Sequence, residues 1–157
     1  MTNGATIATC WYLVDGERVE CEGVTKDHGR ISRVATAPRP IQFLGTHPLT
    51  GDSVIAAARG TDEPGVERPV MIAANSLAHL GDEGLDVQLL QPLVAFVAEE
   101  CIEVAAGRFD ARRYTIRWSE TMPHKTDFWV TADDCLPLLS LVPALGERYE
   151  LAEFERF

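Results

Sequence analysis

The N-terminal stretch of the chain alternates apolar and polar residues on either side of a turn signal. Two strand-like segments, Ala5–Val14 and Glu17–Gly23, flank the dipeptide Asp15-Gly16. This dipeptide suits a two-residue β-hairpin, because both turn positions need a positive φ. Residues that face each other then have numbers that sum to 31, which places Cys10 opposite Cys21 on the more apolar face. The pattern predicts a hairpin with that face toward a core.

Three further segments before residue 60 have the composition of β-strands. They are Arg30–Ala37, Ile41–Leu44 and Ser53–Arg59, and residues rich in turn formers separate them. Pro38 and Pro40 cannot both donate to a β-ladder, so they mark an edge or a crossing between strands. The first 60 residues therefore predict an antiparallel meander.

Two later segments repeat apolar residues at helical spacing. The first runs from Val70 to Leu80, although 70–74 also suits a buried strand. The second, Pro92–Ala106, predicts the main amphipathic helix, and Gly107 can end it. The apolar side of this predicted helix is formed by Leu93, Val94, Val97, Cys101, Val104 and Ala105, and its acidic side by Glu99, Glu100 and Glu103.

The last third of the chain predicts a second hairpin and two less regular segments. Arg112–Glu120 alternates strictly, and Asp127–Thr131 is the expected return strand. A loop centred between Pro123 and His124 would place Trp118 opposite Trp129. Residues 136–145 contain two prolines and predict a short helix at most, while 148–157 suits either a last strand or a docked helix.

These elements predict an α+β fold. We expect a mostly antiparallel sheet, made of the N-terminal meander and the C-terminal hairpin, with the Pro92–Ala106 helix and one or two shorter helices packed on it. We find no internal repeat or long linker, and 157 residues is the length of one ordinary domain. The prediction is therefore a single α+β domain over 1–157.

Charge changes this picture because it is unevenly placed along the chain. The formal charge is −10, and residues 1–78 carry 7 basic and 9 acidic side chains (−2), whereas 79–157 carry 7 basic and 15 acidic ones (−8). An acidic surface disfavours binding to nucleic acid or to anionic lipid, and it attracts a basic protein partner. The alternative is that the net charge only keeps the protein soluble.

The N-terminus does not resemble a secretory signal, because no Lys or Arg precedes its apolar stretch. The longest apolar run, Leu89–Ala98, is about half of the roughly 20 residues that a membrane span needs. We therefore expect a cytoplasmic protein that makes no membrane contact.

The four cysteines do not have the spacing of a metal site. Cys101 and Cys135 are isolated in sequence, and Cys10 with Cys21 would supply only half of a tetrahedral zinc site. In a reducing compartment, two small apolar side chains in a core face are the simpler interpretation of Cys10 and Cys21. We expect no metal and no cofactor.

The histidines are the candidates for acid–base chemistry. All four, His28, His47, His79 and His124, lie in or beside predicted turns or helix ends, where surface histidines are also common. His124 lies three residues before Asp127, which could orient it as a base. None of the common nucleophile, phosphate-binding or zinc-protease motifs is present. The sequence therefore assigns no catalytic residue.

A set of aromatic and acidic residues gives a candidate binding site. Trp118 and Trp129 near a turn could form an aromatic platform, although such pairs also simply stabilise sheets. The acidic side of the predicted helix could meet a basic surface, although solvated acidic faces are common. The candidate binding residues are Trp118, His124, Asp127, Trp129, Glu99, Glu100 and Glu103.

Two function classes follow. The first is a non-enzymatic binding protein, such as an inhibitor, an immunity-type protein or an adaptor subunit, whose acidic C-terminal half engages a basic protein. The second is a small enzyme or small-molecule binder that uses a loop histidine and a nearby aspartate in a pocket between helix and sheet. The missing catalytic set favours the first.

Overall fold

The computed structural model describes residues 8–25, 29–45, 48–75, 87–120 and 125–155. It is mostly β, with 58% strand and 8% helix, so the α+β prediction with several packed helices is wrong. The chain divides into two compact units. Unit 1 comprises 1–46 and 71–90, and unit 2 comprises 47–70 and 91–157. The single domain over 1–157 stays a prediction.

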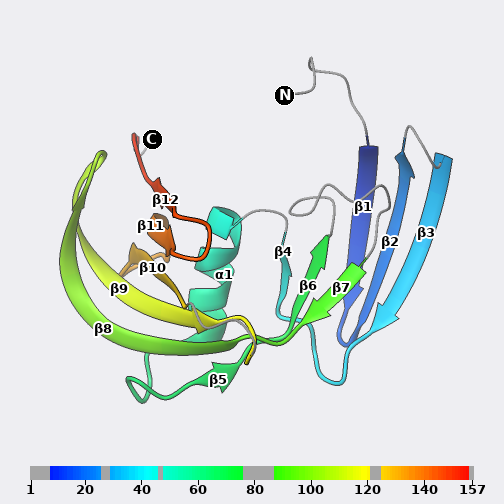
Figure 1. The fold of residues 1–157 in the computed structure, drawn as a ribbon, viewed down its shortest axis with the longest axis horizontal. Helices are drawn as coiled ribbons and strands as arrows, with labels where there is room; N and C mark the ends of the chain where they lie inside the picture. The colour runs from blue at the N-terminus through cyan, green and yellow to red at the C-terminus, as the bar shows by residue number, and fades with distance from the viewer. Residues whose placement is uncertain (1–7, 26–28, 46–47, 76–86, 121–124, 156–157) are drawn as a thin grey trace. The chain divides into compact units, whose positions relative to one another are not determined.

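The elements of the described residues are shown in Figure 1. In chain order they are β1 (Ala8–Asp15), β2 (Arg18–Thr25), β3 (Gly29–Thr36), β4 (Phe43–Gly45), α1 (Pro48–Arg59), β5 (Arg68–Pro69), β6 (Ile72–Asn75), β7 (Val87–Leu90), β8 (Leu93–Val104), β9 (Gly107–Arg117), β10 (Thr126–Thr131), β11 (Pro137–Val142) and β12 (Glu147–Glu150).

Unit 1 consists of two three-stranded sheets. The first, β1-β2-β3, confirms the predicted antiparallel meander for its first three strands only, since the strand predicted at Ile41–Leu44 belongs to the second sheet as β4. Pro38 and Pro40 lie in the connection that leaves β3. In the second, β6 pairs with β4 in parallel and with β7 antiparallel. Cys21 and Ile31 form a buried cluster, and Val87 of the second sheet packs against it. This burial joins the two sheets of the unit.

The first hairpin forms with a register different from the predicted one. Asp15 is opposite Arg18, so paired residues sum to 33, and Cys10 faces Gly23 rather than Cys21. The turn is Gly16-Glu17, and Gly16 has a φ of 58°, as the first central residue of a type II′ turn requires. Each residue keeps its predicted face, since a change of two in the sum preserves the alternation.

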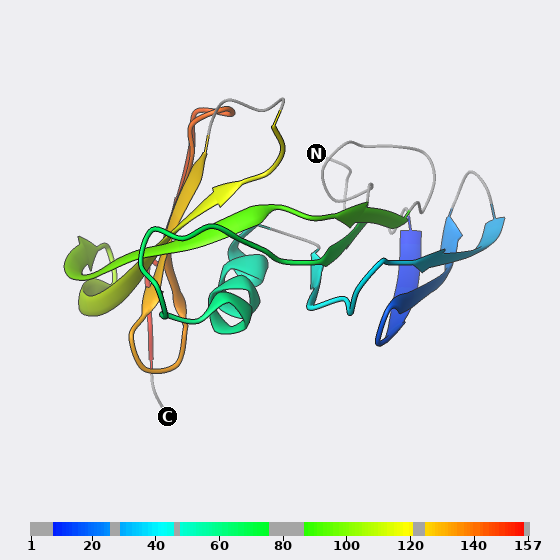
Figure 2. The ribbon, with the colours of Figure 1, turned by 90° about the horizontal axis from the view of Figure 1, so that it is seen from below.

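Unit 2 is built on an antiparallel six-stranded sheet of order β12-β11-β10-β9-β8-β5. Helix α1 packs against β8, β10 and β11 on one face of this sheet, and the long strands β8 and β9 curve around it (Figures 1 and 2). Tyr114 is at the centre of this core. Its ring centroid lies 5.2 Å from that of Phe128 and 5.6 Å from that of Phe96.

Residues predicted as a strand at Ser53–Arg59 belong instead to helix α1. Asp52, Ile55, Ala56 and Arg59 are all buried, and their spacing of three, four and seven residues is that of one helical face. Pro48 occupies the first helical position, which its fixed φ suits. Two of the four residues on this face are ionisable, and for that reason it was not recognisable as an apolar stripe.

The predicted main helix, Pro92–Ala106, is instead strand β8. Val94, Ala95 and Phe96 are consecutive and all buried, so the start of the strand is covered on both faces. A β-bulge between Phe96 and Ala98 then changes which residues share a face. The apolar residues thereby fall at intervals that resemble helical spacing.

Three other predictions were wrong or incomplete. Ile72–Asn75 is β6, which favours the strand alternative for 70–74; residues 76–80 lie outside the described residues. The short helix predicted over 136–145 is strand β11, and Pro137 is tolerated because it is the first residue of that strand. The last-strand alternative for 148–157 is confirmed in part by β12.

A second apolar cluster lies on the opposite face of the unit 2 sheet from α1. Trp129 is buried there, while its neighbours Phe128 and Val130 are buried toward the other face. The chain after β12 helps to close this cluster, because Leu151 donates its N–H to Leu138 and accepts one from Ala106, at 2.8 and 3.0 Å. The members of the cluster include Val104, Ala111, Trp129, Leu138 and Leu139.

Candidate functional site

The structure brings together three of the sequence-predicted site residues, Glu100, Asp127 and Trp129. Trp129 donates its indole N–H to Glu100 Oε1 at 2.5 Å. The guanidinium carbon of Arg113 lies 5.2 Å from the centroid of the Trp129 ring, and Arg113 Nη2 lies 2.9 Å from Asp127 Oδ2. Trp129 is only 7% exposed, so this cluster fixes the sheet and presents no open aromatic platform.

The predicted pairing of the two tryptophans is wrong. Trp129 lies opposite Arg113, and the hairpin of β9 and β10 pairs Thr126 with Ile116. Trp118 is half-buried and donates its indole N–H to Thr126 Oγ1 at 3.0 Å. Each indole therefore has its own hydrogen-bond partner within the sheet.

The three glutamates of the predicted helix do not form one acidic face, because a strand alternates its side chains. Glu99 lies 3.3 Å from Arg112 Nε, and Glu100 accepts from Trp129. Glu103 lies opposite Arg108 in the β8–β9 ladder. The acidic side of the predicted helix is thus divided between the two faces of a sheet.

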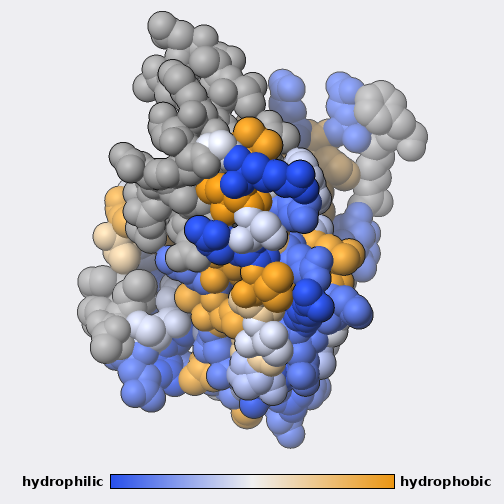
Figure 3. All heavy atoms as spheres, turned by 90° about the vertical axis from the view of Figure 1, so that its right-hand side faces the viewer, coloured by the Kyte–Doolittle hydropathy of each residue, from blue (hydrophilic) through white to orange (hydrophobic). Residues whose placement is uncertain are grey.

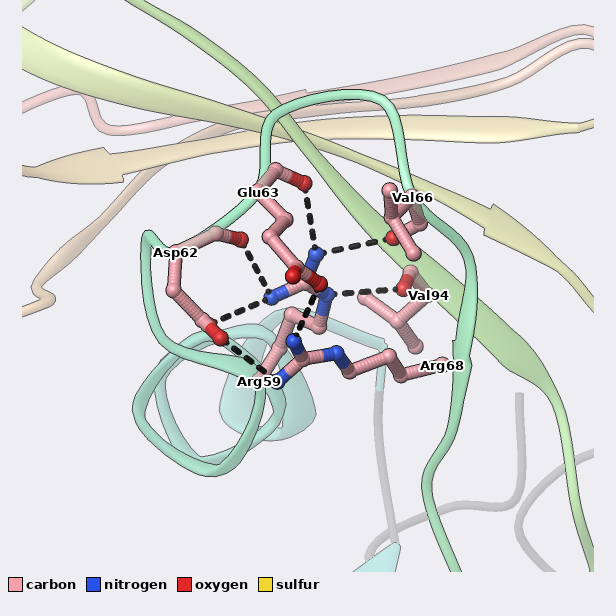
Figure 4. A network of polar contacts seen from close by, with 6 residues as sticks. All are labelled: Arg59, Asp62, Glu63, Val66, Arg68 and Val94. Atoms are coloured by element: carbon pink, nitrogen blue, oxygen red, sulfur yellow. Dashed lines mark hydrogen bonds and ion pairs between the residues drawn. The ribbon is translucent and has the colours of Figure 1, made fainter.

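An acidic loop that follows α1 is also neutralised within the chain (Figure 4). Arg59 is fully buried, and its guanidinium donates to the carbonyls of Asp62, Glu63, Val66 and Val94 and to the Asp62 carboxylate. Arg68 pairs with Asp62 and Glu63, both at 2.6 Å. These bonds fix the loop and leave Arg59 no free donor for a ligand.

Glu67 ends this loop between two cations. Arg117 Nη2 lies 2.6 Å from Glu67 Oε2, and Lys125 Nζ lies 3.0 Å from Oε1. The hydrogen bond from Arg117, followed by the one from Lys125, lowers the pKa of Glu67 to about 2. This carboxylate is therefore held ionised by structural partners.

A groove of about 410 Å³ at one end of the unit 2 sheet differs from these paired regions. The start of β9, the loop after β10 and the C-terminal tail form its walls. Its volume falls in the range of ligand-binding pockets. The lining residues are Arg108, Phe109, Asp110, Thr131, Ala132, Asp133 and Phe154.

Backbone hydrogen bonds hold the walls of the groove in place. Ala132 donates its N–H to the Asp110 carbonyl at 3.0 Å, which ties the β10–β11 loop to β9. The loop itself is closed by Thr131, whose Oγ1 accepts the Leu136 N–H at 2.8 Å and donates to Asp134. Cys135 adopts a φ of 57°, so the loop turns sharply there. The loop wall of the groove is therefore fixed against β9.

The groove contains a carboxylate that takes no part in the ion pairs along the strands. Asp110 is exposed and, among the described residues, makes no ion pair within 4 Å. Asp133 is exposed on the facing wall, and Arg108 is turned toward Cys101, with Nε 2.9 Å from the sulfur. Phe154 is 38% exposed between Glu153 and Glu155 in the sequence. Aromatic and acidic groups thus share one concave surface.

The described residues that line the groove include no histidine, and the described part of the chain offers neither a metal site nor a membrane-spanning helix. All four histidines, His124 included, lie outside the described residues. Within the described ranges, no group of three or more His, Cys, Asp or Glu residues could hold a metal ion. No helix in the described part of the chain is long and apolar enough to cross a membrane. The cytoplasmic location stays a prediction.

Comparison with protein-family models, with curated proteins and with solved structures finds no match to this chain. The function of the candidate site therefore has to be inferred from the chemistry of its own residues.

Proposed function

We propose that this protein is a non-enzymatic acidic binding protein, of the inhibitor, immunity or adaptor kind, and that the unit 2 groove takes a basic segment of a protein partner. The observation that carries the proposal is the groove itself, in which Asp110 and Asp133 face a space beside the aromatic rings of Phe109 and Phe154. An Arg or Lys side chain is the ligand that carboxylates and aromatic faces both attract.

The charge of unit 2 supports the same ligand. Residues 47–70 and 91–157 contain 9 basic and 16 acidic side chains, which gives −7, whereas unit 1 contains 5 and 8, which gives −3. Many of the unit 2 carboxylates are paired with arginines along the sheet, for example Asp127 with Arg113 and Glu67 with Arg117. The excess negative charge of unit 2 attracts a cation. Asp110 in the groove belongs to none of the ion pairs within 4 Å among the described residues, and Arg108, which lines the same groove, interacts with it electrostatically.

A titration with a short arginine-rich peptide tests this proposal. Amide signals of the ¹⁵N-labelled full chain should shift at the groove residues, and the affinity should fall steeply as salt is added. The double variant Asp110→Asn with Asp133→Asn keeps side-chain size and should weaken binding about tenfold or more, the equivalent of roughly 1.4 kcal/mol.

The matched control removes two acidic charges outside the groove. Glu99→Gln with Glu147→Gln changes the net charge equally, and Glu99 is already paired with Arg112. This control should bind the peptide nearly as well as the wild-type chain. Equal weakening by both double variants, or shifts spread over the whole surface, would show that only net charge attracts the peptide and would overturn the groove as the site.

A further inference from the structure

The β1-β2-β3 sheet of unit 1 has an apolar face that the groove does not explain. Along β2, Val19 and Cys21 are fully buried, whereas the alternate residues point to the opposite face. On that opposite face Leu13 lies beside Glu20, and Glu20 beside Val34. We call it the outer face; it includes Trp11, Leu13, Asp15, Arg18, Glu20, Glu22, Val24, Arg30, Ser32, Val34 and Thr36.

Large apolar side chains are exposed together on this outer face. Trp11 is 55% exposed, Leu13 62%, Val24 52% and Val34 55%, and they come from all three strands. Figure 3, which views the molecule from the right-hand side of Figure 1, shows apolar patches separated by hydrophilic ones. Large exposed apolar surfaces rimmed by polar residues are typical of protein–protein interfaces.

The charges on the outer face are paired with one another. Arg18 forms an ion pair with Glu20, and Arg30 Nη2 lies 3.4 Å from Glu22 Oε2. With Asp15 added, the face carries two cations and three carboxylates, a net charge of −1 out of the −10 of the chain. A strongly basic or strongly acidic partner therefore gains little here, and the pairs are less costly to bury than isolated charges.

We propose that the outer face is the interface of a homodimer, in which the outer face of a second copy covers it. A two-fold interface uses the same patch on both subunits, so the patch must complement itself in polarity and charge. An apolar face with nearly balanced, internally paired charges meets that condition, whereas two copies of unit 2, at −7 each, repel one another. This inference is independent of the groove.

The mass of the full chain in solution is the first test. Sedimentation equilibrium over a dilution series should give twice the chain mass of 17.3 kDa at high concentration. Leu13→Arg should move the chain to monomer or weaken the dimer at least tenfold. Leu145→Arg, at a leucine that is 67% exposed in unit 2, is the matched control and should leave the dimer intact. A monomeric wild-type chain at every concentration overturns the proposal.

A pair of charge-reversed chains tests the identity of the occupant. Glu20→Arg with Glu22→Arg makes the face strongly basic, and Arg18→Glu with Arg30→Glu makes it strongly acidic. Each variant alone should be monomeric through self-repulsion, and the two together should form a heterodimer. Recovery of the heterodimer also shows that both variants are folded. If both stay homodimeric, or if folded variants with native circular dichroism fail to combine, the outer face is not the interface.

Discussion

Helix α1 buries two ionisable side chains on one face, and the fold treats them in opposite ways. The three guanidinium nitrogens of Arg59, the last residue of the helix, donate to five acceptors, four of which are backbone carbonyls. Asp52 is also buried, yet within the described residues its Oδ2 has no hydrogen-bond partner. A guanidinium cannot lose its charge in a protein and so needs acceptors, whereas a carboxyl can bind a proton instead.

Burial accordingly raises the pKa of Asp52 to about 8. The nearby Ser140 hydroxyl on β11 opposes this rise in the pKa. It does so without a well-formed hydrogen bond, since neither Ser140 Oγ nor Asp52 Oδ2 has a hydrogen-bond partner among the described residues. At neutral pH most Asp52 side chains are therefore protonated. Helix α1 therefore tolerates a buried charge only where the fold provides its partners.

Removal of the Arg59 guanidinium should cause the largest loss of stability that we expect. Arg59→Met keeps much of the buried volume but leaves the carbonyls of Asp62, Glu63, Val66 and Val94 without their donor. The free energy of unfolding, measured with urea, should fall by about 3–5 kcal/mol. Arg68→Met is the control, since Arg68 binds the same loop from an exposed position and should cost much less. Equal losses would mean that burial does not distinguish the two arginines.

Asp52→Asn should stabilise the fold, in contrast to Arg59→Met, and mainly at high pH. The pKa of Asp52 is about 8 in the fold and 3.8 in the unfolded chain, so the wild-type chain loses stability as pH rises between these values. The variant lacks this loss. Its free energy of unfolding, relative to that of the wild-type chain, should therefore increase by up to about 4 kcal/mol between pH 5 and pH 9, at roughly 1.4 kcal/mol per pH unit below pH 8. Urea unfolding of both chains across this range measures it. A constant difference would show that Asp52 is ionised in the fold.

The same helix shows why part of the fold was not predictable from the sequence. Alternation correctly predicted β1, β2 and β3, because one face of their sheet is buried and the other is exposed. In α1 the buried face includes Asp52 and Arg59, and their charge conceals the helical period. In β8 both faces are buried at the start and a bulge follows, so the alternation that identifies a strand is lost.

The candidate site was predictable only in part, for a related reason. Glu100, Asp127 and Trp129 were predicted as binding residues for three separate reasons, and the sheet brings them together. Arg113 joins them because its strand lies between theirs. The groove combines β9, the loop after β10 and the tail, which are distant in sequence and share no motif. Sheet order, rather than residue spacing, creates both clusters.

Glu67 extends the comparison to a carboxylate that does have partners. The hydrogen bonds from Arg117 and Lys125 lower its pKa from 4.5 to about 2. The stability that ionised Glu67 gives the fold is therefore fully present above about pH 4.5 and is lost as the pH falls toward 2. Allowing for solvent screening, Glu67→Gln should destabilise the chain by about 1–2 kcal/mol at pH 7 and not at pH 2. Acid titration of unfolding, with Glu99→Gln as the exposed control, measures the difference. A loss that is equal at both pH values would exclude the ion pairs as its cause.

Ser140→Ala should give the smallest change in stability and the sharpest test of the environment of Asp52. The Ser140 hydroxyl is fully buried without a partner among the described residues, so its removal should change the free energy of unfolding by less than about 1 kcal/mol at pH 5. Because Ser140 opposes the upward shift of the Asp52 pKa in the fold, its loss should move the upper end of the pH-dependent fall in stability to higher pH. The pH profile of urea unfolding measures this displacement, and in the Asp52→Asn background the same substitution should produce none. A displacement that persists in that background would assign the titration to a group other than Asp52.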